Sequence, residues 1–146
     1  MAKEDKEHCI FCKIIAREAP ASIIYEDDKV LVFPPLQPVN EGHLLVIPKK
    51  HAPYLADLDE ETTMYVMKIA KKMARAIRKS KYKSEGINLF LADGEAAHQE
   101  VFHLHLHVYP RFTGDDFGFK YDSQKHFVEM QRTELDKVAE EIKAHL

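Results

Sequence analysis

Apolar residues recur at helical spacing in three segments of the chain. The longest segment covers about 58–79, where one side carries Met64, Met67, Ala70, Met73, Ala74 and Ile77. Asp57 and Glu60 have the spacing of a capping box at its start. A short helix is predicted at 10–17, before an Ala-Pro pair that ends it. Thr133 is the predicted cap of a last helix.

Five further segments have the apolar, β-branched composition of strands. Their predicted ranges are 22–27, 29–33, 41–48, 87–92 and 101–109. The first two form a predicted hairpin that turns near Asp27 and Asp28, and Pro110 is expected to end the last strand. Helices combined with mostly sequential strands favour an α+β domain with an antiparallel sheet. We expect residues 1–146 to form one domain, with the motifs in 9–112 and a C-terminal extension at 113–146.

Composition narrows the class of protein. The 146 residues carry a formal net charge of −3, and 45% of them are hydrophobic, which suits one domain with a proper core. The mixed charge argues against binding to bulk nucleic acid but permits a nucleotide ligand. No apolar run approaches the roughly 18 residues that span a bilayer, and the charged start has no signal-peptide core. We therefore expect no membrane partner and a cytoplasmic location.

The stretch HQEVFHLHLHVYPRF, residues 98–112, places histidine at every second position. Side chains alternate between faces along a strand, so His103, His105 and His107 are expected to share one face. A two-residue step advances about 6.6 Å, so all three imidazoles cannot easily share one ion. Neutral imidazole attacks phosphorus, and a neighbouring imidazole can donate to a phosphoryl oxygen. Amides of the adjacent loop could hold the remaining oxygens, so the row predicts a phosphate site.

Cys9 and Cys12 form a C-x-x-C pair, and the chain has no other cysteine. A disulfide closing so short a loop would be a poor structural bridge, which favours a reducing compartment. The pair supplies half of a tetrahedral zinc site, for which histidines are the available partners. A redox role is less favoured because no thioredoxin-like strand precedes the pair.

The motif HLHLHV resembles the H-x-H-x-H-x-x sequence of the histidine triad (HIT) superfamily of nucleotide hydrolases and transferases. The segments CIFCKI, IIYEDD, PVNEGHLLVIPKKH and ADGEAAHQEVFHLHLHVYPRF are similar to that family in the same order, over about residues 9–112. The resemblance implies a HIT-like fold, with an antiparallel sheet of about five strands, one long helix and a C-terminal helix.

The resemblance also implies catalytic roles. His105 is similar to the nucleophile that attacks the α-phosphorus and forms a nucleotidyl-histidine, which water then resolves. His107 would contact the same phosphate, and His43 would lie across the site. The implied enzyme is a phosphoramidase or a dinucleoside polyphosphate hydrolase acting on a purine nucleotide such as an AMP or GMP derivative.

Further residues are assigned to binding by the same resemblance. The apolar wall around the base matches Ile10, Phe11, Ile14, Phe33 and Leu36, and the loop beside the phosphate matches Gln99, Glu100 and Val101. Family members with C-x-x-C imply a structural zinc site at Cys9, Cys12, His51 and His103. The resemblance also implies a homodimer in which the long helix and the fourth strand meet their copies.

Three positions depart from the family pattern. Pro35 stands where Asp or Asn usually binds the ribose, Ala92 where Asn or Gln is common, and His98 where Gly is usual. Each lost side-chain hydrogen bond would cost about 1 kcal/mol. These departures keep a second interpretation open, in which the chain is a non-catalytic, zinc-stapled module that binds a nucleotide or a protein.

Overall fold

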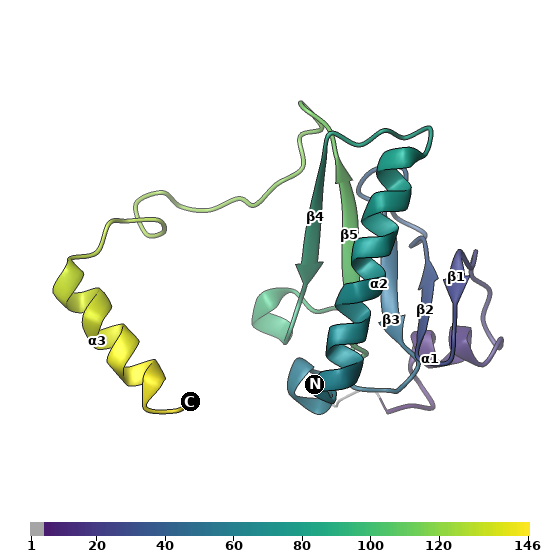
Figure 1. Cartoon of the computed structure of the whole chain (residues 1–146), viewed down its shortest axis with the longest axis horizontal. Coiled ribbons are helices and arrows are strands. Elements are labelled where there is room, and N and C mark those ends of the chain that lie inside the picture. Colours follow the sequence, from purple (N-terminus) through teal and green to yellow (C-terminus); the bar gives the residue numbers. More distant parts are fainter. Residues whose placement is uncertain (1–4) are drawn as a thin grey trace. The chain divides into compact units, whose positions relative to one another are not determined.

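A computed structural model describes residues 5–146 (Figure 1). The chain divides into two compact units, of which the first ends at Asp115 and the second spans Asp116–Leu146. The single domain expected over 1–146 stays a prediction. No helix in the described part of the chain is long and apolar enough to cross a membrane.

The first unit contains the predicted antiparallel sheet of five strands, and the expected fold class is confirmed. The strands are β1 (Tyr25–Glu26), β2 (Val30–Phe33), β3 (Leu44–Pro48), β4 (Gly86–Leu91) and β5 (Leu106–Arg111). Their order across the sheet is β1-β2-β3-β5-β4, and every neighbouring pair is antiparallel. The histidine-rich segment therefore leads into a central strand, while β4 lies at one edge.

Helix α2 (Glu60–Lys79) covers one face of the sheet (Figure 1). Its buried side packs on alternate residues of the strands, among them Val32, Val46, Leu106 and Val108. The predicted capping box was wrong by two residues. Asp59 is the cap, because its carboxylate accepts the amide hydrogen of Thr62, whereas Asp57 belongs to a short 3-10 turn, Leu55–Asp57.

Helix α1 (Ile10–Ile15) packs with the residues of β2 and β3 that point the other way. Leu31, Phe33, Leu45 and Ile47 belong to this second apolar cluster. Because both faces of β2 and β3 are covered, these strands are continuously apolar, as is typical of strands buried on both sides. The cysteine pair and the histidines of the predicted site lie on this α1 face of the sheet.

Strand β5 begins and ends later than its sequence pattern predicts. The expected range was 101–109, but His103 and His105 precede the strand, and Pro110 lies within it. The carbonyl of Pro110 accepts the side-chain amide of Asn40, beyond Leu44, where the pairing of β3 with β5 ends. The missing N–H of Pro110 therefore interrupts no bond to β3, and the strand continues.

The second unit contains α3 (Arg132–Lys143). Its cap is Gln131 rather than the predicted Thr133, and the amide of Gln131 donates to the carboxylate of Glu134 at 3.3 Å. Every residue of 116–146 is exposed.

Asp27 organises the turn between β1 and β2. One carboxylate oxygen accepts the amides of Lys29 and Val30, both at 2.9 Å. The other accepts the hydroxyls of Tyr25 and Tyr65, at 2.8 and 2.7 Å. Burial alone would raise the pKa of Asp27, but these hydrogen bonds, with Tyr65 first, lower the pKa to about 2.

We expect Asp27→Ala to lower the free energy of unfolding at pH 7 by about 2 kcal/mol, because four donors lose a charged acceptor. The folded pKa lies below the unfolded value, so this stabilisation is present above about pH 4 and is lost as the pH falls towards 2. Chemical denaturation at pH 7 and pH 3 measures both effects. The exposed neighbour supplies the control, since Asp28→Ala should change stability little, and equal losses in both variants would contradict this account.

Candidate functional site

Two cysteines and two histidines converge between α1 and the segment that leads into β5. Ligand atoms of Cys9, Cys12, His51 and His103 all lie within 4.8 Å of one another. His103 Nδ1 lies 3.4 and 3.5 Å from the two sulfurs and 3.3 Å from His51 Nδ1, and Cys12 Sγ lies 3.3 Å from His51 Nδ1. A tetrahedral zinc ion with ordinary bond lengths separates its ligands by about 3.3–3.8 Å. This group of four residues could therefore hold a metal ion.

Local structure positions three of these four side chains. Cys9 caps α1, so one helical turn brings Cys12 beside it. His103 Nε2–H donates to the carbonyl of Pro48 at 2.7 Å, which turns its Nδ1 towards the sulfurs. Burial, with the adjacent Cys9, raises the pKa of the Cys12 thiol to about 12, and burial lowers the pKa of His103 to about 4. A bound cation would favour the thiolates, so this donor set fits zinc.

The next histidine is held by the backbone of the first. His105 Nδ1 donates its hydrogen to the carbonyl of His103 at 2.8 Å, which leaves the lone pair of Nε2 available. The ring is buried and meets the edge of Phe11, with ring centroids 5.1 Å apart. Burial lowers the pKa of His105, against the opposing effects of the His103 carbonyl and of Glu100. The arrangement presents a neutral imidazole with one unprotonated nitrogen.

His43 and His107 form a directed pair beside it. The amide of Val39 donates to His43 Nδ1, so His43 Nε2 carries the hydrogen that it donates to His107 Nδ1 at 2.9 Å. His107 must then carry its own hydrogen on Nε2. Burial and the neighbouring histidines lower the pKa of His43 to about 4 and of His107 to about 3. Both rings therefore stay neutral near pH 7, and His107 offers a fixed N–H donor.

The predicted apolar wall is only partly assembled. Phe11, Ile14 and Phe33 are buried in one cluster, and Val101 packs against it. Ile10 is half-exposed, and Leu36 is fully exposed at 102% and lies outside that cluster. The role of these residues around a base stays a prediction.

The loop 93–100, which contains the 3-10 turn Glu95–Ala97, is tied down by Gln99. The side chain of Gln99 accepts the amide of Gly94 at 2.8 Å and donates to the carbonyls of Pro53 and Val101 at 2.7 and 3.1 Å. Gln99 thus shapes the loop with the polar atoms that the sequence had assigned to a ligand. Glu100 is exposed. Burial lowers the pKa of His105 and raises the pKa of Tyr109, and the charge of Glu100 opposes the first shift and adds to the second.

Sequence reasoning missed Tyr109 and Phe90 as parts of the site. Tyr109 is buried, stacks on His107 at 5.1 Å and meets the edge of His43 at 4.5 Å. Phe90 of β4 lies against both His107 and Tyr109. The period of two from His105 through His107 to Tyr109 could have identified the tyrosine, whereas Phe90 is brought there by the pairing of β4 with β5.

His98 has a left-handed backbone, with φ 64° and ψ 34°. This conformation explains why glycine is common at the position, since a Cβ costs about 1–2 kcal/mol there. Two residues of the same loop, Gly94 and His98, therefore have positive φ.

We expect His98→Gly to raise the free energy of unfolding by about 0.5–1 kcal/mol, because relief of the strain exceeds the added entropy of the unfolded chain. The matched control is Ala97→Gly, one residue earlier without positive φ, which should lose about that amount. Urea denaturation of the two variants decides the question. A loss of stability in His98→Gly would show that its side chain matters more than its backbone.

The comparisons with known proteins agree with this geometry. The family model described as "HIT domain" matches residues 16–114. A crystal structure of a HIT family protein from Bacillus anthracis superimposes with a TM-score of 0.86 at 37% identity, covering 96% of this chain and 98% of that one. The crystal structure of a Zn-bound histidine triad family protein from Mycobacterium smegmatis superimposes with a TM-score of 0.75 at 42% identity. It covers 82% of this chain and 86% of that one.

Among the curated relatives, adenosine 5'-monophosphoramidase HNT1 of Saccharomyces cerevisiae is 41% identical over 103 residues, which are 70% of this chain and 62% of that protein. The family match includes the histidine row and all five strands of the first unit. On these grounds the chain belongs to the HIT domain family.

Proposed function

We propose that the chain hydrolyses a nucleoside phosphoramidate or a dinucleoside polyphosphate at the α-phosphate, through a nucleotidyl intermediate on His105. The observation that carries this proposal is the hydrogen bond from His105 Nδ1 to the His103 carbonyl, which leaves Nε2 as a neutral nucleophile. The phosphoramidase activity named for the yeast relative supports the reaction class.

In the first step, the lone pair of His105 Nε2 forms a bond to the α-phosphorus. The bond from phosphorus to the leaving nitrogen or oxygen breaks. The leaving group keeps the electron pair of that bond and takes a proton from solvent. The N–H on His107 Nε2 donates to a phosphoryl oxygen, where negative charge develops. Because His43 directs this hydrogen through a second hydrogen bond, the donor is oriented before substrate arrives.

In the second step, water attacks the same phosphorus and the bond to His105 breaks. The products are a nucleoside monophosphate and the free imidazole, and the water proton is lost to solvent. The buried rings of Phe11 and Phe33 exclude water from one side of the nucleophile. We propose that the apolar cluster containing these two rings contacts the base of a purine nucleotide, such as an AMP or GMP derivative.

Pro35 and Ala92 favour the second candidate function, a non-catalytic module that binds a nucleotide or a protein. Proline offers no side-chain hydrogen bond to a ribose, and Ala92 is a buried methyl group. A chain that is inert towards a panel of adenosine and guanosine phosphoramidates and dinucleoside polyphosphates, yet binds the nucleotide, would support the module.

His105→Ala should abolish turnover on that panel, by at least about 10³-fold, while nucleotide binding and thermal stability change little. His107→Ala should slow the reaction without abolishing it, because His107 assists and does not bond to phosphorus. Mass spectrometry of quenched wild-type enzyme should find the nucleotidyl adduct on His105. Turnover by His105→Ala at the wild-type rate would end the proposal.

The same nucleophile sets the acid limb of kcat/KM. Only neutral His105 attacks, and burial lowers its pKa below the ordinary value of 6.5, so activity should persist below pH 6.5 and decline only at lower pH. This places the limb lower than the sequence alone suggests. A pH profile of kcat/KM measures it, and an apparent pKa above 6.5 would contradict the buried, neutral ring.

We also propose that Cys9, Cys12, His51 and His103 hold a structural zinc ion, as the four-residue geometry and the Zn-bound relative support. Four protein ligands leave no open position for water, so the ion would supply structure rather than a nucleophile. It would fasten α1 to the segment before β5.

Protein purified without chelator should hold about one zinc per chain, and a strong chelator should lower its melting temperature. Cys12→Ser should lose most of the zinc, whereas His126→Ala, an exposed substitution in the second unit, should retain it. Metal analysis and thermal melting measure both. Zinc-free protein with two freely reactive thiols would overturn the assignment.

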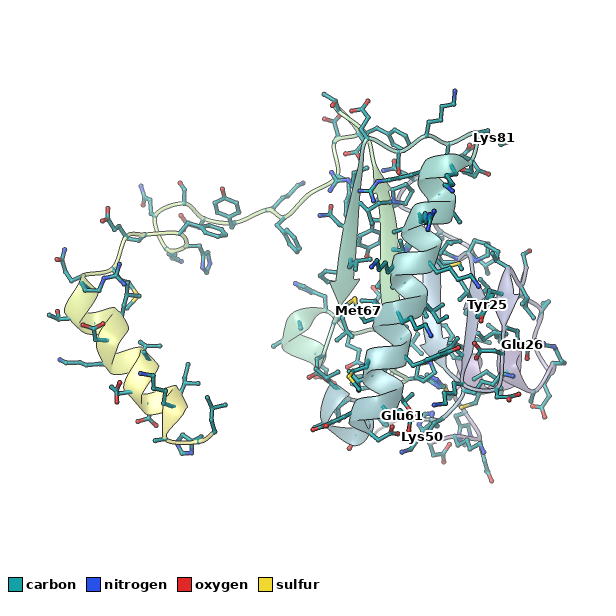
Figure 2. The ribbon with its side chains drawn as sticks, viewed as in Figure 1. Tyr25, Glu26, Lys50, Glu61, Met67 and Lys81 are labelled. Atoms are coloured by element: carbon teal, nitrogen blue, oxygen red, sulfur yellow. The ribbon has the colours of Figure 1, made fainter. Side chains whose placement is uncertain are left out.

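We propose that the chain is a two-fold homodimer built from α2 and β4. β4 is an edge strand with Leu89 exposed, and Met64 and Met67 are exposed in the first half of α2. In Figure 2, Met67 projects from the side of α2 nearer to β4. Pairing two copies through these residues would bury apolar surface and cover the sheet edge.

Wild type should scatter light as about twice the 16.9 kDa chain, whereas Met67→Glu should be a monomer, because a two-fold contact brings the two carboxylates close together. The control is Ile23→Glu, near the opposite edge of the sheet, which should stay dimeric. A monomeric wild type at micromolar concentration would contradict the proposal.

A further inference from the structure

One stretch of the chain contains positive charges without negative ones. Between Glu61 and Glu85 there is no acidic residue, although the whole chain is net negative. The same stretch contains eight basic residues, which are Lys68, Lys71, Lys72, Arg75, Arg78, Lys79, Lys81 and Lys83. The net charge of the chain therefore conceals a strongly basic segment.

The fold places six of these residues on one side of α2. An α-helix turns about 100° per residue, so Lys68, Lys71, Lys72, Arg75, Arg78 and Lys79 fall within an arc of about 120°. We call this set the cationic face. All six side chains are exposed, and the buried Met73 and Ile77 lie on the opposite side, against the sheet. Figure 2 looks onto the outer side of α2, and Lys81 continues past its end.

The charges of the cationic face are not neutralised by neighbours. Among residues 5–146, no ion pair involves any of its six members. Lys72 lies over the ring of Tyr25 and Lys68 over the ring of Tyr65, at 4.4 and 5.4 Å from the centroids. The neighbouring acids are already engaged, since Glu61 pairs with Lys29 and Asp27 accepts four hydrogen bonds.

Helix stability explains only part of this pattern. Arg78 and Lys79 lie in the last turn, where they stabilise the helix dipole. Lys68, Lys72 and Arg75 lie earlier, and like charges three or four residues apart destabilise a helix by about 0.2–0.5 kcal/mol per pair. A solvated face needs no such repulsion, because alternating Glu and Lys would serve better.

We propose that the cationic face of α2 binds the phosphate backbone of nucleic acid. No large hydrophobic side chain is exposed between Lys68 and Lys79, so the face lacks the apolar anchors that protein partners and bilayers require. Recognition by charge alone suits a repeating phosphate backbone, which is bound by Lys and Arg without reading sequence.

This surface is separate from the proposed active site. α2 packs on the sheet face formed by Leu106 and Val108, and the strand alternation directs His107 to the other face. Nucleic acid binding is therefore independent of the hydrolysis at His105, and either proposal can fail without the other.

The test measures binding of a fluorescent 20-base-pair DNA duplex by anisotropy from 50 to 300 mM salt. Wild type should bind with a slope of log K against log salt of about −3 to −5, as expected for three to six phosphate contacts. The variant Lys68→Gln/Lys72→Gln/Arg75→Gln should bind at least tenfold more weakly at 50 mM salt, and its slope should shrink by about 2–3.

The matched control removes three exposed charges elsewhere, with Lys120→Gln/Lys125→Gln/Lys137→Gln, and should bind like wild type. Equal melting temperatures of the three proteins establish that the fold is kept. Equal weakening in both variants would overturn the proposal, because only total charge would matter. A wild type without salt-dependent binding would also overturn it, as would one that binds phosphatidylserine vesicles and not the duplex.

Discussion

The hydrogen bond between the His103 carbonyl and His105 Nδ1 joins the two clusters of reactive side chains in this protein. One is the group of two cysteines and two histidines, and the other is the set of neutral histidines His43, His105 and His107. On one side of that bond, His103 turns Nδ1 towards Cys9 and Cys12. On the other side, His105 is held in the tautomer that leaves Nε2 unprotonated. The position of His105, the proposed nucleophile, therefore depends on the backbone of a residue in the group proposed to hold zinc.

The sheet separates two environments with opposite physical requirements. On the α1 side, the histidines are buried, their pKa values are depressed and their hydrogens are directed from ring to ring. Dry surroundings keep the imidazoles neutral, which nucleophilic attack on phosphorus requires. On the α2 side, the lysines and arginines of the cationic face are exposed to water. A continuous apolar core through β2, β3 and β5 keeps these two environments apart.

Local sequence was a good guide wherever the backbone followed its own periodicity. The existence of α2 and of all five strands followed from the spacing of apolar residues, and the order of the sheet was consistent with an antiparallel α+β fold. Boundaries were less predictable. The helix cap lay at Asp59 rather than Asp57 because the preceding residues form a separate turn. β5 ran through Pro110 because its pairing with β3 stops at Val108, opposite Leu44.

The sequence by itself determined the residue types of the site, since the alternating histidines and the C-x-x-C pair are visible in one dimension. The sequence could not show that His103 and His105 lie outside the strand. Between them, the amide of Leu104 donates to the carbonyl of Ala52, more than fifty residues away in the chain, and residue order does not reveal this contact. Only the tertiary structure brought Phe90 beside His107. It also engaged the side-chain amide of Gln99 in hydrogen bonds with the backbone of Gly94 and Pro53. Distances between remote segments arise from packing, and residue order alone does not contain them.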